Sequence, residues 1–391
     1  MSKNSITRIP ELDGVRGLAV LLVLMVHIIP YNPVLVDLPF SKFIHAFSHM
    51  GWAGVDMFFV LSGFLITSIL LQTKAGVGYF KNFYARRALR IFPLYYLTIT
   101  TVFVVVYIFS PDQRGEVIFS LPWYYLYVSN WGFSFLLLAD PFAVGLTWSL
   151  AIEEQFYLVW PLIVRYLNSK KLAVFSLILV ISSLILRIVM PYIYTSATID
   201  YGELFYHATF TRLDSLILGA LIAVAYESDF WKKLLKIFAA PVLVISLAVV
   251  SYLVYLNPIS PLWDNPPMYI YGFTFIALAA GGLIVMLTTY SESNLLRRVF
   301  RLRFLSFFGK YSYAIYLFHR IPILLLDKIF KENSISGYPG WFLFSFLALL
   351  IPVIMALISW NLFENPILNF KKNFEYQVSE VKTPSPERTT P

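Results

Sequence analysis

Long apolar segments constrain this chain more than any other feature of its sequence. A helix that crosses a hydrocarbon core of about 30 Å needs about 20 apolar residues. Eleven windows of that kind occur among the 391 residues, at 14–30, 53–71, 91–109, 118–138, 146–167, 172–195, 208–226, 237–256, 269–290, 304–327 and 340–363. Only 13% of the residues are charged, whereas a soluble domain has roughly 25%. The sequence therefore predicts an all-α, polytopic membrane helix bundle and excludes a soluble globular enzyme.

The spacing of Lys and Arg tests the number of crossings, because these residues accumulate in cytoplasmic loops. If every window crosses, the basic clusters at 165–171 and 297–303 fall on the outer side. Treating window 118–138 as non-spanning moves both clusters inside, and Pro122 and Gly132 interrupt that window. We therefore expect about ten crossings, one non-spanning or re-entrant segment, and both termini in the cytoplasm.

The two ends of the chain, its net charge and its lack of cysteine define the expected domain organisation and exclude several kinds of site. No small-residue cleavage site follows the first window, so we expect a retained signal-anchor. Residues 1–370 form the predicted transmembrane domain, and residues 371–391 form a cytoplasmic tail expected to be disordered. The net charge of +8 is spread over short hydrophilic gaps, which argues against nucleic-acid binding. Without cysteine the chain has no disulfide, thiolate nucleophile or Cys-type metal site.

Ionisable residues inside the predicted spans mark candidate functional positions, because a charge at membrane depth is costly and normally pairs or faces a wet cavity. Arg16 and His27 share one face of the first helix, separated by about 16 Å of rise. In the predicted orientation Arg16 lies toward the cytoplasm and His27 toward the outer face. Five more residues at the depth of His27 complete an expected outer-half polar cluster: Asp56, Glu153, Glu154, Arg212 and Asp214.

Three arginines, Arg86, Arg87 and Arg90, stand at the predicted cytoplasmic end of the third window. Arg87 and Arg90 share a helix face, and guanidinium groups bind phosphates bidentately. Ordinary anchoring at the cytoplasmic surface explains the same residues equally well. His319 follows a tyrosine-rich helix face and has no partner at a suggestive spacing. The sequence therefore favours a structural and a functional role for His319 equally.

Several segments in one order resemble the membrane acyltransferase 3 family, the O-acetyltransferases that modify bacterial polysaccharides and related glycans. They are Leu12–Gly17 (LDGVRG) ahead of His27, Gly54–Leu65 (GVDMFFVLSGFL), Tyr84–Pro93 (YARRALRIFP), Thr147–Tyr157 (TWSLAIEEQFY), Arg212–Asp214 (RLD), Tyr311–His319 (YSYAIYLFH) and Glu364–Pro366 (ENP). Each segment is weakly specific alone, and together they are specific.

The resemblance implies a bacterial inner-membrane enzyme. Its donor would be acetyl-CoA or another acyl-CoA on the cytoplasmic side, and its acceptor a hydroxyl of a glycan or lipid-linked sugar at the outer face. It also implies that Arg16 and His27 are functional and that Arg87 and Arg90 lie near the donor. Some relatives carry a further crossing and a C-terminal extracytoplasmic hydrolase-like domain. This chain stops after the tenth predicted crossing, which disfavours an acceptor that needs such a domain, unless a separate extracytoplasmic partner supplies it. The partners implied besides membrane lipid are thus acyl-CoA and the acceptor.

Acyl transfer from a thioester to a hydroxyl needs a base, an oxyanion stabiliser and a positioned donor. We assign the base to His27, because imidazole titrates near neutral pH. We expect Glu153 to orient that ring. Glu154 is the less favoured partner, because adjacent positions on a helix point about 100° apart. The sequence leaves open whether His27 instead carries the acyl group transiently. Arg16 is expected to bind a phosphate or the pantetheine arm.

Two further readings bear on this assignment. His45 and His49 have the spacing of a metal pair but lack a third ligand, so we expect no metal. The alternative function is a multi-pass transporter or flippase of a glycan or small anionic substrate, because buried ionisable residues also mark transport paths. Transporters commonly have two related halves, and the Arg16–His27 arrangement has no counterpart in the C-terminal half.

Overall fold

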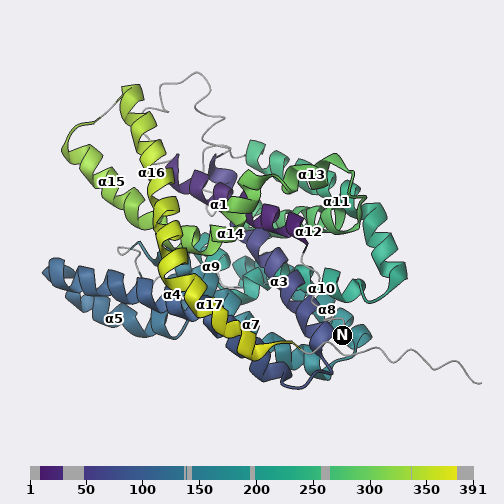
Figure 1. Ribbon diagram of the computed structural model, residues 1–391. Coiled ribbons are helices and arrows are strands. Elements are labelled where there is room, and N and C mark those ends of the chain that lie inside the picture. The colour runs from purple at the N-terminus through teal and green to yellow at the C-terminus, as the bar shows by residue number, and fades with distance from the viewer. Residues whose placement is uncertain are drawn as a thin grey trace, which may run out of the picture.

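A computed structural model describes residues 9–29, 48–135, 138, 143–193, 199–256, 265–335 and 337–376. The described residues contain helices and no strand, which confirms the all-α fold class (Figure 1). The helices are α1 (Pro10–Ile28), α3 (Ala53–Thr73), α4 (Tyr79–Phe109), α5 (Arg114–Tyr125), α6 (Ser129–Ser134), α7 (Trp148–Tyr166), α8 (Ser169–Ile193), α9 (Tyr201–His207), α10 (Thr209–Ala225), α11 (Asp229–Leu256), α12 (Phe273–Thr289), α13 (Leu295–Phe300), α14 (Arg303–Phe318), α15 (Arg320–Glu332), α16 (Gly337–Ser359) and α17 (Asn365–Leu368). Shorter helical turns are η2 (Met50–Trp52), η3 (Pro111–Gln113), η4 (Gly145–Thr147), η6 (Met268–Gly272), η7 (Trp360–Glu364) and η8 (Asn369–Phe374).

The number of crossings stays a prediction. Six helices in the described part of the chain are long and apolar enough to cross a membrane, and the bent pair of α9 and α10 raises the number to seven. Helices α1 and α7 cover predicted spans but each carries three charged residues: Glu11, Asp13 and Arg16 on α1, and Glu153, Glu154 and Arg165 on α7. The membrane location is supported by the outward faces of α8, α11 and α16, which expose large apolar side chains such as Ile178, Val244 and Phe346.

Two predicted windows are broken in the structure. Window 118–138 holds α5 and α6, which have 12 and 6 residues and are too short to cross alone, as its proline and glycine led us to expect. Window 304–327, which we expected to be one span, is divided at His319 into α14 and α15. The physical reason is Pro322, whose ring is incompatible with the carbonyl of Phe318 four residues earlier in a continuous helix.

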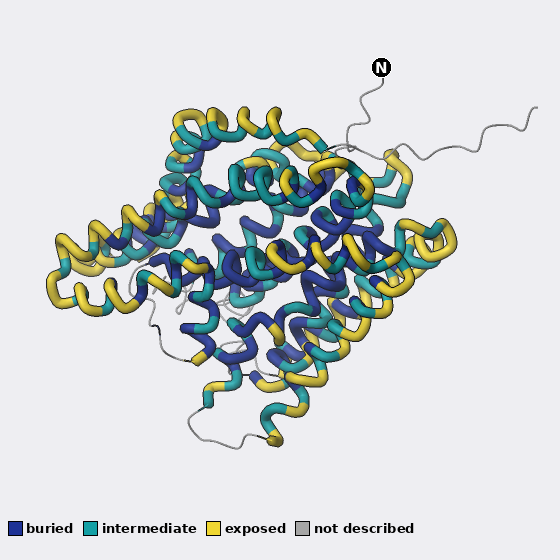
Figure 2. Tube along the Cα trace, turned by 90° about the horizontal axis from the view of Figure 1, so that it is seen from below, coloured by how far each residue is buried: buried dark blue, intermediate teal, exposed yellow. Residues whose placement is uncertain are grey.

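The tightest helix crossings use glycine. Helix α3 packs on α10, and α1 packs on α14. A Cβ atom at Gly63 would overlap the carbonyl oxygen of Leu216, and one at Gly309 would overlap that of Asp13. Figure 2 shows that buried residues concentrate on these central helices, whereas the peripheral helices are exposed along their outer sides. The glycines therefore bring together the backbones that carry the candidate site.

The predicted boundary between the transmembrane domain and the tail, after residue 370, falls within η8, which continues to Phe374 and packs against α4. The division into these two parts stays a prediction. The remaining tail residues, 377–391, lie outside the described residues, as do residues 1–8 and His45.

Candidate active site

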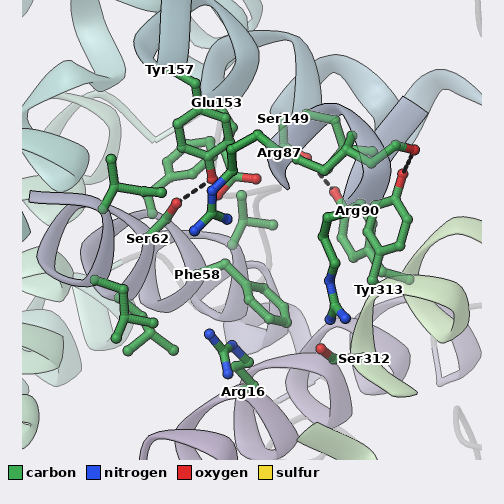
Figure 3. Close-up of a pocket in the computed structure, with 18 residues that line it drawn as sticks. Arg16, Phe58, Ser62, Arg87, Arg90, Ser149, Glu153, Tyr157, Ser312 and Tyr313 are labelled. Carbon is green, nitrogen blue, oxygen red and sulfur yellow. Dashed lines mark hydrogen bonds between the residues drawn. The ribbon is translucent and has the colours of Figure 1, made fainter. Parts of the chain in front are cut away.

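A cavity of about 140 Å³, called the inner cavity below, gathers polar side chains from five helices, α1, α3, α4, α7 and α14. Arg16 comes from α1, Arg87 and Arg90 from α4, and Glu153 and Tyr157 from α7. Figure 3 shows Arg87 beside Glu153 and Tyr157, while Arg90 extends toward the α14 side of the cavity. The two arginine segments that the sequence placed on separate helices therefore share one cavity with a carboxylate.

The inner cavity is predominantly cationic. Arg16, Arg87 and Arg90 are close enough for their charges to repel one another. Glu153 lies within range of the charges of Arg87 and Arg16 and hydrogen bonds with Ser62. Arg16 also donates to Asp13 Oδ1 at 2.7 Å. Three guanidinium groups and one carboxylate line this cavity, and this excess of positive charge suits it to an anionic ligand.

An outer cavity of about 700 Å³ lies on the other side of a shared wall. Its lining includes aromatic rings and several ionisable groups: His27, His49, Trp52, Trp148, Glu203, His207 and Arg320. Val55 and Tyr316 line both cavities. The Tyr316 hydroxyl is held by the carbonyl of Leu146 at 2.9 Å and by Ser149 Oγ at 2.6 Å. The two cavities therefore share part of their lining, at Val55 and Tyr316.

His27 and His319 form a hydrogen-bonded pair beside the outer cavity. Their rings lie edge to face with centroids 4.8 Å apart, and His319 Nε2 is 3.3 Å from His27 Nδ1. His27 Nδ1 is 2.8 Å from the Val23 carbonyl oxygen, and His319 Nδ1 is 2.7 Å from that of Tyr316. A carbonyl oxygen only accepts, so the hydrogen of each neutral ring sits on Nδ1. The lone pair of His27 is then on Nε2.

The position of Glu153 differs from the expected one. We expected Glu153 to orient His27, but it lines the inner cavity whereas His27 lines the outer one. The neighbour that holds the His27 ring is His319, which the sequence left undecided. Similar depth on separate helices does not determine which side chains converge, because the rotation of each helix about its axis is set by packing.

The rest of the expected outer-half cluster is a pair of buried ion pairs. Arg212 Nη2 is 2.9 Å from Asp56 Oδ2, and Arg187 Nη2 is 2.7 Å from Asp214 Oδ2, with all four side chains fully buried. Neither pair lines a cavity described above. Arg212 and Asp214, both on α10, each pair with a residue of another helix. These four residues join α3, α8 and α10 and have a structural role in this arrangement.

Glu154 and Arg86 also lie away from the inner cavity. Glu154 Oε1 is buried without a hydrogen-bond partner among the described residues, and its charge acts on Tyr127 and Tyr313. Arg86, expected at the donor with Arg87 and Arg90, donates to two backbone carbonyls of the C-terminal segment instead.

Several lining residues had not been singled out from the sequence. Ser62, Tyr157, Tyr313 and Tyr316 lie within the motif segments quoted above, so the motifs were the available signal. His207 lines the outer cavity together with Glu203. Among the residues that the structure describes, no group of three or more His, Asp or Glu is arranged to hold a metal ion.

Comparison with known proteins agrees with the motif resemblance. Relatives include the peptidoglycan O-acetyltransferase OatA of Listeria monocytogenes, 30% identical over 94% of this chain. The putative peptidoglycan O-acetyltransferase YrhL of Bacillus subtilis is 31% identical over 96% of the chain, and the O-acetyltransferase OatA of Staphylococcus aureus is 29% identical over 94%. This chain covers 58% of the length of each of these relatives. No solved structure matches the chain. The model of the acyltransferase domain matches residues 9–359, and the chain therefore belongs to this acyltransferase family.

Proposed function

We propose that this protein transfers an acetyl group from acetyl-CoA, bound from the cytoplasm, to a hydroxyl of a cell-wall glycan at the outer face of the membrane. The observation that carries the proposal is the pair of cavities that share Val55 and Tyr316. One cavity is rich in arginine, and the other is lined by three histidines and several aromatic rings. The names of the relatives support peptidoglycan as the first acceptor to test.

The inner cavity is the proposed donor site. Arg87 and Arg90 share a face of α4 and line the cavity with Arg16. Guanidinium forks pair with phosphate oxygens, so these residues would hold the phosphates or the pantetheine arm of acyl-CoA. This assignment puts the arginine end of α4, and with it both termini, on the cytoplasmic side. The thioester would lie toward Val55 and Tyr316, at the wall between the cavities.

His27 is the proposed base. The acceptor oxygen attacks the thioester carbonyl carbon while its proton moves to His27 Nε2. The carbon–sulfur bond then breaks, and the CoA sulfur takes up a proton as it leaves. The Val23 carbonyl and His319 keep the hydrogen of His27 on Nδ1, so that Nε2 can accept. Attack by Nε2 itself on the thioester, followed by transfer from an acyl-histidine, uses the same geometry.

The test is an acetyl-transfer assay with the full chain in lipid nanodiscs. Labelled acetyl-CoA and a peptidoglycan oligosaccharide are supplied, and CoA release and acetylated product are measured. We expect both from the wild type and neither from His27→Ala, while His27→Ala still binds CoA. Labelled product from well-folded His27→Ala would refute the role of His27. Uptake of a substrate into vesicles without CoA release would favour the transporter alternative.

A further inference from the structure

The C-terminal segment that includes η8 lies across the cytoplasmic end of α4. Figure 1 shows the end of the chain, around α17, running along α4, and both α17 and η8 contact that helix. Arg86 Nη1 donates to the carbonyl oxygens of Lys371 at 3.0 Å and Phe374 at 3.2 Å. Asn82 Nδ2 donates to the Glu375 carbonyl at 2.9 Å. The segment is thus attached to the helix that carries two arginines of the inner cavity.

This attachment brings a further cation to the arginines. The charges of Arg90, Arg87 and Arg86 all act on the Lys371 ammonium, and each opposes its positive charge. Lys371 is partly buried, whereas its neighbour Lys372 is exposed. Like charges held together at this density repel by Coulomb's law, so the arrangement is stabilised when an anion enters between them.

The carboxylate of Glu364 lies near Arg90 but does not compensate the positive charge of Lys371. Glu364 acts on Arg90 and accepts a hydrogen bond from Ser359 at 3.3 Å. Within the part of the chain that the structure describes, the charged groups that act on Lys371 are Arg90, Arg87 and Arg86, and no carboxylate is among them. The cationic surface therefore continues from the inner cavity onto the C-terminal segment, beyond the residues that line the cavity itself.

We infer that Lys371 binds a phosphate group of the acyl-CoA donor together with Arg87 and Arg90, and that Arg86 is a positioning residue that holds the Lys371 backbone in place. The inference rests on the proposed function, because it takes acyl-CoA to be the donor in the inner cavity. Acyl-CoA carries a diphosphate and a separate ribose phosphate, which is more anionic surface than the cavity arginines alone would cover. Anionic lipid headgroups offer the same phosphate chemistry, and the experiment separates the two sources.

The experiment measures CoA binding and acetyl transfer by the full chain, first in nanodiscs of neutral phosphatidylcholine and then in nanodiscs that contain phosphatidylglycerol. Lys371→Gln is compared with Lys372→Gln, the matched exposed neighbour, and with Lys371→Arg. Loss of one charge-assisted hydrogen bond predicts a dissociation constant and a KM for acetyl-CoA about tenfold higher in Lys371→Gln, with kcat unchanged. We expect Lys372→Gln to match the wild type and Lys371→Arg to retain binding. A thermal unfolding midpoint close to that of the wild type shows that the variant is folded.

The outcomes separate this inference from the proposed function. If the wild type binds CoA and Lys371→Gln binds it equally tightly, the role of Lys371 is overturned and the donor site stays in place. A wild-type protein that does not bind CoA overturns the donor assignment and this inference with it. A loss that appears only in nanodiscs containing phosphatidylglycerol assigns Lys371 to a lipid headgroup and also overturns the inference.

Discussion

Replacing His319 tests whether the histidine pair works as a base with a positioning partner. The bond from His27 Nδ1 to His319 Nε2 is long, at 3.3 Å, and the Val23 carbonyl at 2.8 Å also accepts from the same nitrogen. His319→Ala removes only the longer of the two acceptors. A neutral hydrogen bond contributes about 0.5–1.5 kcal/mol, so kcat should fall about tenfold or less. His27→Ala removes the base itself and should cost about 10²–10⁴-fold.

The assay is initial-rate acetyl transfer from labelled acetyl-CoA, with kcat and KM determined for both histidine variants. His319→Gln is the matched control, since its amide oxygen can accept from His27 Nδ1 as the imidazole nitrogen does. We expect it to exceed His319→Ala in kcat, with KM for both substrates near the wild-type values. CoA binding and the unfolding midpoint check that the fully buried His319 position tolerates the change.

Two results would refute this account of the pair. If His319→Ala is as inactive as His27→Ala and remains folded, His319 takes part in the chemistry directly rather than positioning the base. If His319→Gln is no better than His319→Ala, the hydrogen bond between the rings does not contribute to the rate.

Three further predictions follow from the buried charges. Arg90→Ala should raise KM for acetyl-CoA with little change in kcat, measured by initial rates at varied donor; a purely lowered kcat would contradict the donor role. Asp56→Asn leaves Arg212 buried without its counter-charge and should lower the free energy of unfolding by about 3–5 kcal/mol, measured by denaturant titration against the wild type; an unchanged value would refute this role. Glu11, ahead of the first predicted span, is buried, which raises its pKa, but its bonds with Arg297 and the nearby arginine charges hold that pKa below the ordinary 4.5. The contribution of Glu11 to stability is therefore present above pH 4.5 and is lost as the pH falls through its folded-state pKa. As the pH is lowered below 4.5, the unfolding midpoint should fall less in Glu11→Gln than in the wild type. The same pH dependence of the midpoint in both proteins would contradict the ion pair.

The corrections to the expected site share one physical cause. Glu153 and His27 were paired from their depth, and Arg86 was grouped with Arg87 and Arg90 from its proximity in sequence. In the structure Glu153 and His27 line different cavities, and Arg86 bonds to backbone 285 residues further along the chain. Distance along a helix follows from counting residues, but the partner of a side chain depends on helix rotation and on segments far away in sequence.

The sequence alone determined the class of this protein and the inventory of its site. The length and hydropathy of its windows required a helical membrane bundle, because unpaired backbone groups cannot remain in hydrocarbon. Its motif segments identified the family and most of the residues that line the inner cavity. The sequence also indicated that window 118–138 is interrupted, although Pro122 lies inside α5 and Gly132 inside α6, with the break between the two helices.

Only the tertiary structure decided which of these site residues line the inner cavity and which line the outer one. Glycine crossings at Gly63 and Gly309 set the close approach of α3 to α10 and of α14 to α1. That packing gathers Arg16 with Arg87 in one cavity and joins His27 to His319 beside the other. These contacts link residues up to 292 positions apart, and no local pattern specifies them because they depend on the shapes of several helices packed together.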